Sequence, residues 1–469
     1  MANNSKREYT VFTKNWFNNT QYSNSIVDAA LAFNKFLHDE FEVVQDYLYL
    51  NMTVIRCDER DIKKLGNHKA FKSAITSTYP IKDFHRVLYG LNALQNQYMY
   101  QVYEWWFHRK NGVTLPNNRF EGGIYPAGDY PATPKSKHLV RELRKYECPP
   151  AYMPVLNLSI GPEYARNTHV DHALQILSET RLLTISAGND GRPAGNQSSI
   201  NKFIRDEPHN GILVVGATDE SGDKLADYSS TGLKNEKYRR PCIVARPGKI
   251  TGTSFAAPKV ANLACVCFDA IFQIANVECT SRSDKAAGVP LVGWGLIDKL
   301  EGELGLPGRA DIPAMPFLGV FEKELRDAFS ILHKKDLVPV FSVHGPPIRR
   351  LILDCARKLN GYERHEVGSG FVSQELLLDY LANLHLGKIL SMFCDNVSSV
   401  QIPAAVWNLK VFDRDELSEL AEIGQASRPI WAYDYLEPKF IVNRIDGGVL
   451  APIPNSHGGQ VAAAGAGIV

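Results

Sequence analysis

The chain has 469 residues, of which 44% are hydrophobic and 22% are charged, and it carries a formal net charge of +1. This length exceeds what one ordinary hydrophobic core accommodates, so we expect two domains or one large domain with additions. The near balance between 52 basic and 51 acidic residues excludes charge as an argument for a nucleic-acid or membrane-surface partner. No stretch approaches about 18 uninterrupted apolar residues, which argues against a membrane span.

The eight cysteines are scattered along the chain. Their spacing matches neither a disulfide framework nor, together with the histidines, a zinc site. Residues 1–8 carry charges with no apolar run behind them, so no secretory signal is expected. Because reduced thiols are typical of the cytoplasm, we predict a cytoplasmic protein without a metal or other cofactor.

Residues 1–115 have apolar side chains at helical spacing, first over 26–48 and again over 81–108. The second segment ends in an aromatic cluster at 103–107, which fits either core packing or a partner-binding surface. We predict a mostly helical N-terminal region, through which a regulatory protein partner would bind.

The pattern changes after a loop region at 111–134, rich in glycine, proline and asparagine, and a predicted short helix at 138–146. Short apolar runs then alternate with helical segments, at 155–160, 182–186, 212–215 and 242–245. This alternation predicts an α/β fold, with a parallel sheet covered by helices on both faces. Side chains just beyond the carboxyl ends of these strands are expected to carry the chemistry.

Ser254 is a candidate catalytic nucleophile. It lies in Gly-Thr-Ser-Phe-Ala-Ala-Pro at 252–258, at the predicted start of a helix. The free N–H groups and the dipole at a helix N-terminus favour the charge that develops when serine attacks a carbonyl. The glycine permits a tight turn before the serine, and the alanines let the helix pack closely on the sheet. Taken alone, a serine at a helix start is usually an N-cap.

Three segments resemble the subtilisin-like serine peptidase (subtilase) family, in the order and with the spacing typical of it. Residues 252–260 resemble the nucleophile motif, and Ser-Ala-Gly-Asn-Asp-Gly at 186–191 resembles the oxyanion motif. Val-Leu-Asn-Leu-Ser-Ile-Gly at 155–161 resembles the strand that lines the substrate pocket. Further likenesses to the fold occur at 214–217, 228–232, 348–359 and 361–372.

The resemblance implies a serine endopeptidase that acts on protein or peptide substrates. Ser254 would be the nucleophile, and the Asn189 side chain would donate a hydrogen bond to the tetrahedral oxygen. Small residues leave the main specificity pocket open, which is compatible with a large P1 side chain. The residues that would bind the substrate backbone and wall this pocket are Ser159, Ile160, Gly161, Ser186, Ala187 and Gly188.

The order of the motifs departs from the family. Members carry Asp, then His, then Ser, but no Asp or His motif precedes Ser159. The C-terminus supplies both instead: Asp446 ends a strand-like segment at 440–445, and His457 begins a segment that resembles the His motif. This implies a circularly permuted subtilase, in which His457 is the general base and Asp446 orients its imidazole. The segment at 440–445 is then expected to be a parallel strand in the sheet of 155–160.

Alternatives remain open at this point. Residues 451–469 are rich in alanine and glycine and would form a tail if the likeness around His457 is accidental. A second candidate base is His344, although two prolines follow its glycine. If His457 lies far from Ser254, the chain is an inactive subtilase fold used as a binding or scaffold protein. A peptidase completed by the C-terminal segment of a neighbouring copy is a third possibility.

The expected domain layout follows from these segments. It comprises a helical N-terminal region at 1–115, a subtilisin-like core at 116–380 with an insertion at about 270–343, a connecting region at 381–430, and a segment at 431–469 that completes the core.

Overall fold

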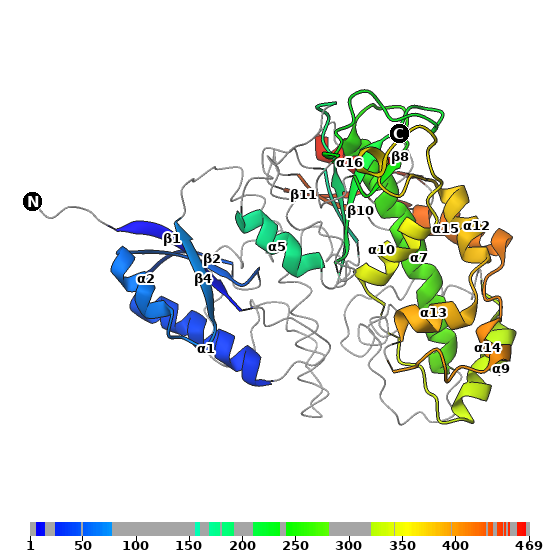
Figure 1. The fold of residues 1–469 in the computed structure, drawn as a ribbon, viewed down its shortest axis with the longest axis horizontal. Coiled ribbons are helices and arrows are strands. Elements are labelled where there is room, and N and C mark those ends of the chain that lie inside the picture. Colours follow the sequence, from blue (N-terminus) through cyan, green and yellow to red (C-terminus); the bar gives the residue numbers. More distant parts are fainter. Residues whose placement is uncertain are drawn as a thin grey trace, which may run out of the picture.

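A computed structural model of the chain contains an N-terminal α/β unit and a larger core built on a parallel sheet (Figure 1). The residues that the structure describes are 6–14, 24–47, 50–76, 155–159, 168–178, 181–191, 210–234, 241–280, 320–341, 343–394, 396–427, 430–434, 439–443, 445–446, 449–450 and 457–465.

The N-terminal unit has a four-stranded antiparallel sheet in the order β2-β3-β1-β4. Its elements are β1 (Arg7–Thr13), α1 (Asn24–Glu40), β2 (Glu42–Tyr47), β3 (Met52–Cys57), α2 (Glu59–Leu65) and β4 (Phe71–Thr76). Helices are present, as predicted, but they alternate with four strands that the expectation of a mostly helical region did not include. The predicted helix at 81–108 and its aromatic cluster lie outside the described residues.

The predicted helix at 26–48 is correct only as far as Glu40. Beyond it, residues 42–47 pair with β3, and Val43 lies opposite Ile55. A β-branched residue such as Val43 loses rotamer freedom in a helix and packs well on a pleated sheet. The apolar spacing that continued the helical pattern therefore belongs to a strand.

Within this unit, the Asp46 carboxylate lies in a polar cluster between α1, β2 and β3. It accepts hydrogen bonds from Asn34 Nδ2 at 3.2 Å, Thr53 Oγ1 at 3.1 Å and His38 Nε2 at 3.0 Å. The side chain of Asp46 is only 9% exposed. The hydrogen bond to Asp46 raises the pKa of His38 above its ordinary value of 6.5.

This raised pKa predicts a pH-dependent stability of the N-terminal unit. Protonated His38 is favoured in the folded state, so the stabilisation is fully present below pH 6.5 and is lost as the pH rises through the folded-state pKa. Hydrogen exchange of amides in residues 6–76, followed across this window, should show faster opening at higher pH than intrinsic exchange explains. The variant His38→Gln keeps a donor but does not titrate, and it should lack this component. Equal pH dependence in both proteins would contradict the assignment.

The core sheet has five parallel strands in the order β5-β6-β7-β8-β9. They are β5 (Val155–Leu158), β6 (Leu182–Ser186), β7 (Ile212–Ala217), β8 (Ile243–Ala245) and β9 (Phe371–Val372). All residues of β6, β7 and β8 are buried, as expected for strands covered on both faces. The predicted α/β fold is confirmed, and the four strands predicted from the sequence are β5 to β8.

The helix α7 (Thr253–Thr280) runs through the centre of this core. By length and composition its first part could cross a membrane, but 72% of the tested stretch is buried inside the structure. A core helix passes the same test, so this is weak evidence for a membrane span. The helix continues to Thr280, so it spans the position of about residue 270 where the insertion was expected to begin. Residues 281–319 lie outside the described part.

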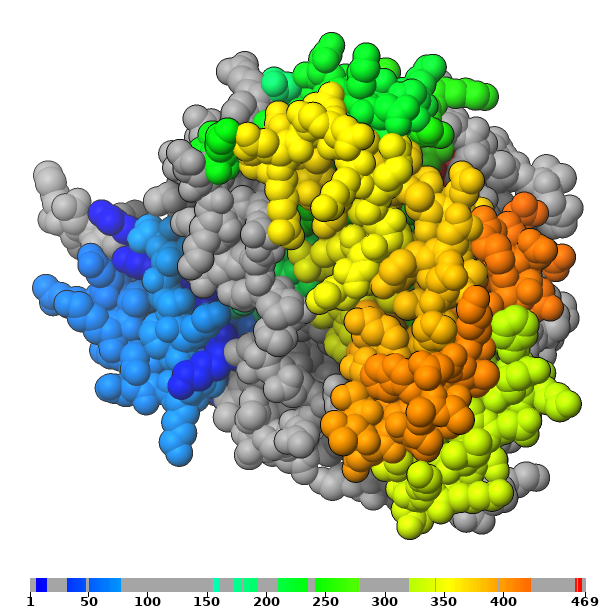
Figure 2. All heavy atoms as spheres, turned by 45° about the vertical axis from the view of Figure 1, so that its right-hand side comes forward, coloured from blue at the N-terminus to red at the C-terminus, as the bar shows by residue number. Residues whose placement is uncertain are grey.

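A group of helices lies beside the core, and three of them fall at 381–430, where a mixed connecting region was expected. Buried leucines such as Leu378 and Leu390 join it to the same hydrophobic cluster as α7. Figure 2 shows these helices as a continuous surface beside the core. They are α9 (Glu322–His333), α12 (Gln374–Ala382), α13 (Leu386–Phe393), α14 (Ala404–Trp407) and α15 (Arg414–Ser427).

The C-terminal segment forms short hairpins and a helix. Strand β11 (Lys439–Asn443) pairs antiparallel with β10 (Ile430–Asp434), and β12 (Ile445–Asp446) pairs antiparallel with β13 (Val449–Leu450). The prediction that 440–445 is a parallel strand in the sheet of 155–160 is therefore wrong. Pairing with a neighbour close in sequence needs less loop-closure entropy than pairing with β5. The helix α16 (His457–Gly465) follows.

The N-terminal sheet packs against the core through α5 (Thr168–Ser178), which connects β5 to β6 (Figure 1). One face of the sheet lies against α1 and α2. The other face belongs to the hydrophobic cluster of the core, with Phe12, Met52 and Val54 grouped with Leu174 of α5. The rings of Phe12 and His172 meet edge to face, with their centroids 4.8 Å apart. Both faces of the N-terminal sheet are therefore covered.

Candidate active site

Three segments meet at the carboxyl edge of the parallel sheet. Ser159 follows β5, Ser186 ends β6, and Ser254 is the second residue of α7, which follows β8. Parallel strands end at the same edge, so the predicted pocket, oxyanion and nucleophile segments come together although they are far apart in sequence. Ile160 and Gly161, predicted in the pocket, lie outside the described residues.

The turn before Ser254 needs a glycine. Gly252 has a φ of +135°, which L side chains rarely adopt, and its N–H donates to the hydroxyl of Tyr228 at 3.0 Å. Ser254 then lies in the first turn of α7, where backbone N–H groups have no partner within the helix. The N–H groups of Thr253 and Phe255 donate to Asn189 Oδ1 and to the Gly252 carbonyl, so the backbone donor beside the half-buried Ser254 side chain is the N–H of Ser254 itself.

Pro258 explains how the pocket strand is tied to this turn. In a helix, the N–H of residue 258 would bond to the carbonyl of Ser254, but proline has no N–H. Ser159 Oγ donates to that carbonyl instead, at 2.7 Å. The proline of the motif therefore leaves the Ser254 carbonyl available, and the buried hydroxyl of Ser159, just after β5, donates to it.

Ser159 is itself held by polar side chains of the sheet. Asn157 Nδ2 donates to Ser159 Oγ at 3.0 Å, and Thr184 Oγ1 of β6 donates to Asn157 Oδ1 at 2.9 Å. This chain of hydrogen bonds links β6, β5 and the backbone of Ser254. Its members satisfy one another, which fixes their rotamers.

Asn189, the predicted oxyanion donor, is oriented by Thr253. Its Oδ1 accepts hydrogen bonds from the backbone N–H of Thr253 at 2.9 Å and from Thr253 Oγ1 at 3.0 Å. Because an N–H can only donate, the oxygen of the amide must face Thr253, and Nδ2 is left as the outward donor. A Cβ at position 252 would lie 3.7 Å from Nδ2, so this amide nitrogen is next to the turn that precedes Ser254.

The segment beside Asn189 is also bound to α7. Gly188 N–H donates to Thr253 Oγ1 at 3.1 Å, and Gly188 has a φ of +102°. Ser186 is buried at the end of β6, Ala187 is half-buried, and the side chain of Asn189 is exposed. Residues 186–188, which were predicted to wall the specificity pocket, thus connect the buried sheet to the exposed side chain of Asn189 next to Ser254.

The two C-terminal candidates are placed by their backbone. Asp446 ends β12, and His457 is the first residue of α16. The helix α16 packs against α7 and the β10–β11 hairpin. Val461 and Ala464 form a buried cluster with Phe255, the residue after Ser254. A Cβ at Gly465 would lie 3.4 Å from the Cβ of Pro258.

The alternative base His344 lies at the wrong edge of the sheet. It precedes α10 (Gly345–Asp354), and a Cβ at Gly345 would lie 2.1 Å from the backbone oxygen of Arg181. Arg181 directly precedes β6, whereas the candidate site lies after β6 ends at Ser186. The length of β6, about 13 Å at 3.3 Å per residue, separates His344 from that edge.

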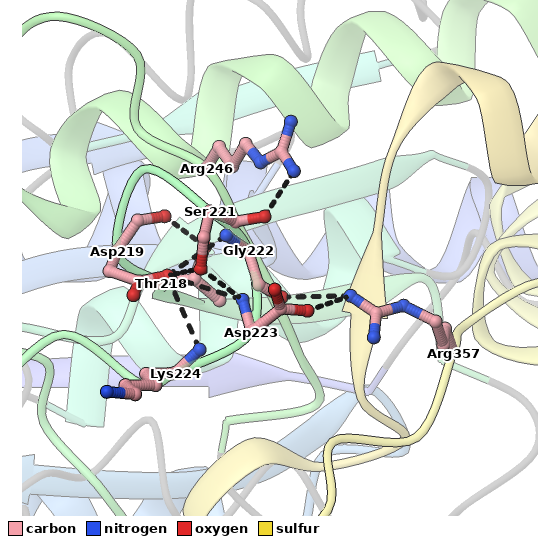
Figure 3. A network of polar contacts seen from close by, with 8 residues as sticks. All are labelled: Thr218, Asp219, Ser221, Gly222, Asp223, Lys224, Arg246 and Arg357. Carbon is pink, nitrogen blue, oxygen red and sulfur yellow. Dashed lines mark hydrogen bonds and ion pairs between the residues drawn. The ribbon is translucent and has the colours of Figure 1, made fainter.

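The turn after β7 closes the same edge of the sheet towards β9 (Figure 3). Asp219 Oδ1 accepts hydrogen bonds from Ser221 Oγ at 2.8 Å and from backbone N–H groups of the turn, and these lower the pKa of Asp219. Arg357 binds Asp223 at 2.9 Å, and Arg246 binds the backbone oxygen of Ser221. Both guanidinium groups lie 5.3 Å from the ring centre of Phe371 in β9. The connection that leads from Arg246 to Ser254 is thereby anchored at its start.

Sequence reasoning missed four residues that hold the site: Thr253, Tyr228, Asn157 and Thr184. All four stand in or next to segments that resembled the subtilase family. Their polar side chains in otherwise apolar or small-residue runs were the available signal. Their partners are set by contacts between distant segments, which the spacing of residues does not reveal.

Part of the chain matches a known protein family. Residues 135–279 match the model of the subtilase family (peptidase S8). Comparison with curated proteins gives no match. The matched region contains Ser159, Asn189 and Ser254 but neither Asp446 nor His457.

Solved structures of similar proteins have low identity to the chain. The prenylagaramide maturation protease PagA is 16% identical over 52% of this chain and 66% of its own, with a TM-score of 0.24. The epidermin leader peptide processing serine protease EpiP of Staphylococcus aureus is 12% identical over 80% of this chain and 98% of its own, with a TM-score of 0.32. A mutant of EpiP is 13% identical over 79% and 99%, with a TM-score of 0.30. The family match spans the segments that carry Ser159, Asn189 and Ser254, so residues 135–279 are similar to the subtilase family of serine peptidases.

Proposed function

We propose that the chain is an endopeptidase whose catalytic triad occurs in the permuted order Ser254, Asp446, His457. The observation that carries this proposal is the packing of α16 on the first turns of α7, where Val461 and Ala464 contact Phe255. The C-terminal helix thus lies against the helix of the nucleophile in the same chain. This favours a triad completed in cis over one completed by a neighbouring copy.

The helical spacing of α16 supports His457 as the base. Residues four and seven positions apart lie on one face of a helix. His457, Val461 and Ala464 have this spacing, and the latter two face Phe255. The same spacing would put His457 on the face of α16 that turns towards α7, one helical turn before the contact with Phe255. Asp446 lies in β12, which precedes α16 in the chain.

The proposed chemistry divides among these residues as follows. His457 takes the proton of the Ser254 hydroxyl as the serine attacks the peptide carbonyl, and returns it to the leaving amine. Asp446 orients the imidazole and stabilises its charged form. Asn189 Nδ2 and the backbone N–H of Ser254 donate to the tetrahedral oxygen. Ser159 and residues 186–188 hold the substrate backbone beside the pocket.

A fluorophosphonate probe tests the proposal, because it reacts only with an activated serine. The chain should be labelled at Ser254, and labelling should vanish in Ser254→Ala. A matched control is Ser391→Ala on α13, where the hydroxyl donates to the Lys388 carbonyl at 2.7 Å, away from the sheet edge. The control should label like the wild type. Absence of labelling in a folded wild-type chain would favour an inactive subtilase fold that binds peptides or acts as a scaffold.

A further inference from the structure

Residues 228–230 run alongside the segment that carries Asn189. Ser230 N–H donates to the Gly188 carbonyl at 3.0 Å, and Asp190 N–H donates to Ser230 Oγ at 3.1 Å. Gly191 N–H donates to the Tyr228 carbonyl at 2.9 Å. A Cβ at Gly191 would lie 2.5 Å from the Asp227 carbonyl oxygen, so the two segments are in close backbone contact.

The same residues are anchored to the sheet. Ala217 N–H, at the end of β7, donates to Ser229 Oγ at 3.0 Å. Ser229 and Ser230 are 2% and 1% exposed. Buried and hydrogen-bonded on two sides, residues 228–230 form a rigid strut between β7 and the segment of Asn189.

Tyr228 extends this strut to the nucleophile. Its hydroxyl accepts the Gly252 N–H at 3.0 Å. Gly252 lies before α7 in an unusual backbone conformation, with a φ of +135°. The backbone of Tyr228 thus holds the segment of Asn189, while its side chain holds the turn that precedes Ser254.

We infer that Tyr228 is a positioning residue that sets the distance between the oxyanion donor and the nucleophile. This inference rests on the proposed function of Ser254 and Asn189. The hydrogen bonds from the donors to the tetrahedral oxygen tolerate shifts of only a few tenths of an ångström. Small shifts of the turn therefore reduce the stabilisation of the transition state. The Tyr228 hydroxyl binds the turn at Gly252, so its loss is expected to leave substrate binding in the ground state largely unchanged.

The variant Tyr228→Phe tests this role, since it removes one oxygen and keeps the ring. We expect kcat to fall about 10-fold, the scale of one lost hydrogen bond, with KM changed less than about twofold. The control is Tyr380→Phe on α12. It removes a hydroxyl that donates to Asp354 Oδ2 at 3.5 Å, and it should leave kcat and KM unchanged. A change confined to KM, or no change in kcat, would overturn the inference.

A double variant separates positioning from general destabilisation. If Tyr228 acts through the oxyanion geometry, Tyr228→Phe should cost less in the Asn189→Ala background than in the wild type. Independent effects, which multiply, would show that the hydroxyl acts elsewhere. Fluorophosphonate labelling of the wild type comes first: a chain that does not label refutes the proposed function and this role with it. A chain that labels, but turns over equally with and without the hydroxyl, refutes only the role of Tyr228.

Discussion

Replacing Ser254 or His457 by alanine is expected to lower kcat about 10⁶-fold, and replacing both is expected to lower it no further. Nucleophile and base act as a unit, so the second loss removes nothing that the first has left, a behaviour and scale found for a subtilisin. Peptide hydrolysis by the single and double variants measures this directly. The non-additivity would tie His457 to Ser254 although the two residues lie far apart in sequence.

Two further variants make this test specific to the permuted triad. Asp446→Asn should cost about 10⁴-fold, because the amide would favour the wrong tautomer of the imidazole. His344→Ala is the matched control, because His344 lies at the amino edge of β6, and it should keep full activity. A large loss in His344→Ala together with an active His457→Ala would contradict the assignment of the base.

Replacing Asn189 by alanine is expected to lower kcat by about 10²–10³ with little change in KM, a magnitude known from this family. The amide hydrogen bond forms with the charged tetrahedral oxygen and only weakly with the ground-state carbonyl. Its removal therefore raises the free energy of the transition state more than that of the bound substrate. Steady-state kinetics on one peptide substrate separates the two constants. A loss expressed only in KM would mean that Asn189 positions the substrate.

The alanine variant also removes the acceptor that Thr253 uses, so a second variant is needed. Asn189→Asp keeps Oδ1 for the hydrogen bonds from Thr253 N and Oγ1 but replaces the Nδ2 donor by an acceptor. If the donor is what matters, Asn189→Asp should be at least as slow as Asn189→Ala. An aspartate variant close to the wild type would instead assign the effect to the support of Thr253.

The core of the fold could be predicted because its strands carry a local signal. The segments β5 to β8 are short apolar runs between helical stretches, and burial on both faces makes each run continuous. The glycine of the nucleophile turn is likewise a local requirement, since the φ of +135° at Gly252 excludes most other residues. Such local features can be recognised from the sequence alone.

What escaped prediction depends on contacts between distant segments. Val44 continues a helical pattern but lies in β2, which pairs with β3 in a sheet, because tertiary pairing overrides a weak propensity. The strand β11 looked like a member of the core sheet but found a partner close in sequence. The bond from Ser159 Oγ to the Ser254 carbonyl joins residues 95 positions apart. No periodicity encodes such a pair.

The covered face of the N-terminal sheet has a consequence for any protein that would bind α5. Phe12 already contacts His172 of this helix, and Phe12, Met52 and Val54 share its hydrophobic cluster within the same chain. Tethered modules have effective concentrations on the order of millimolar. A separate partner must therefore outcompete an intramolecular rival, or meet a chain from which residues 6–76 have been cut. Covalent continuity between the two units thus controls which proteins can reach α5.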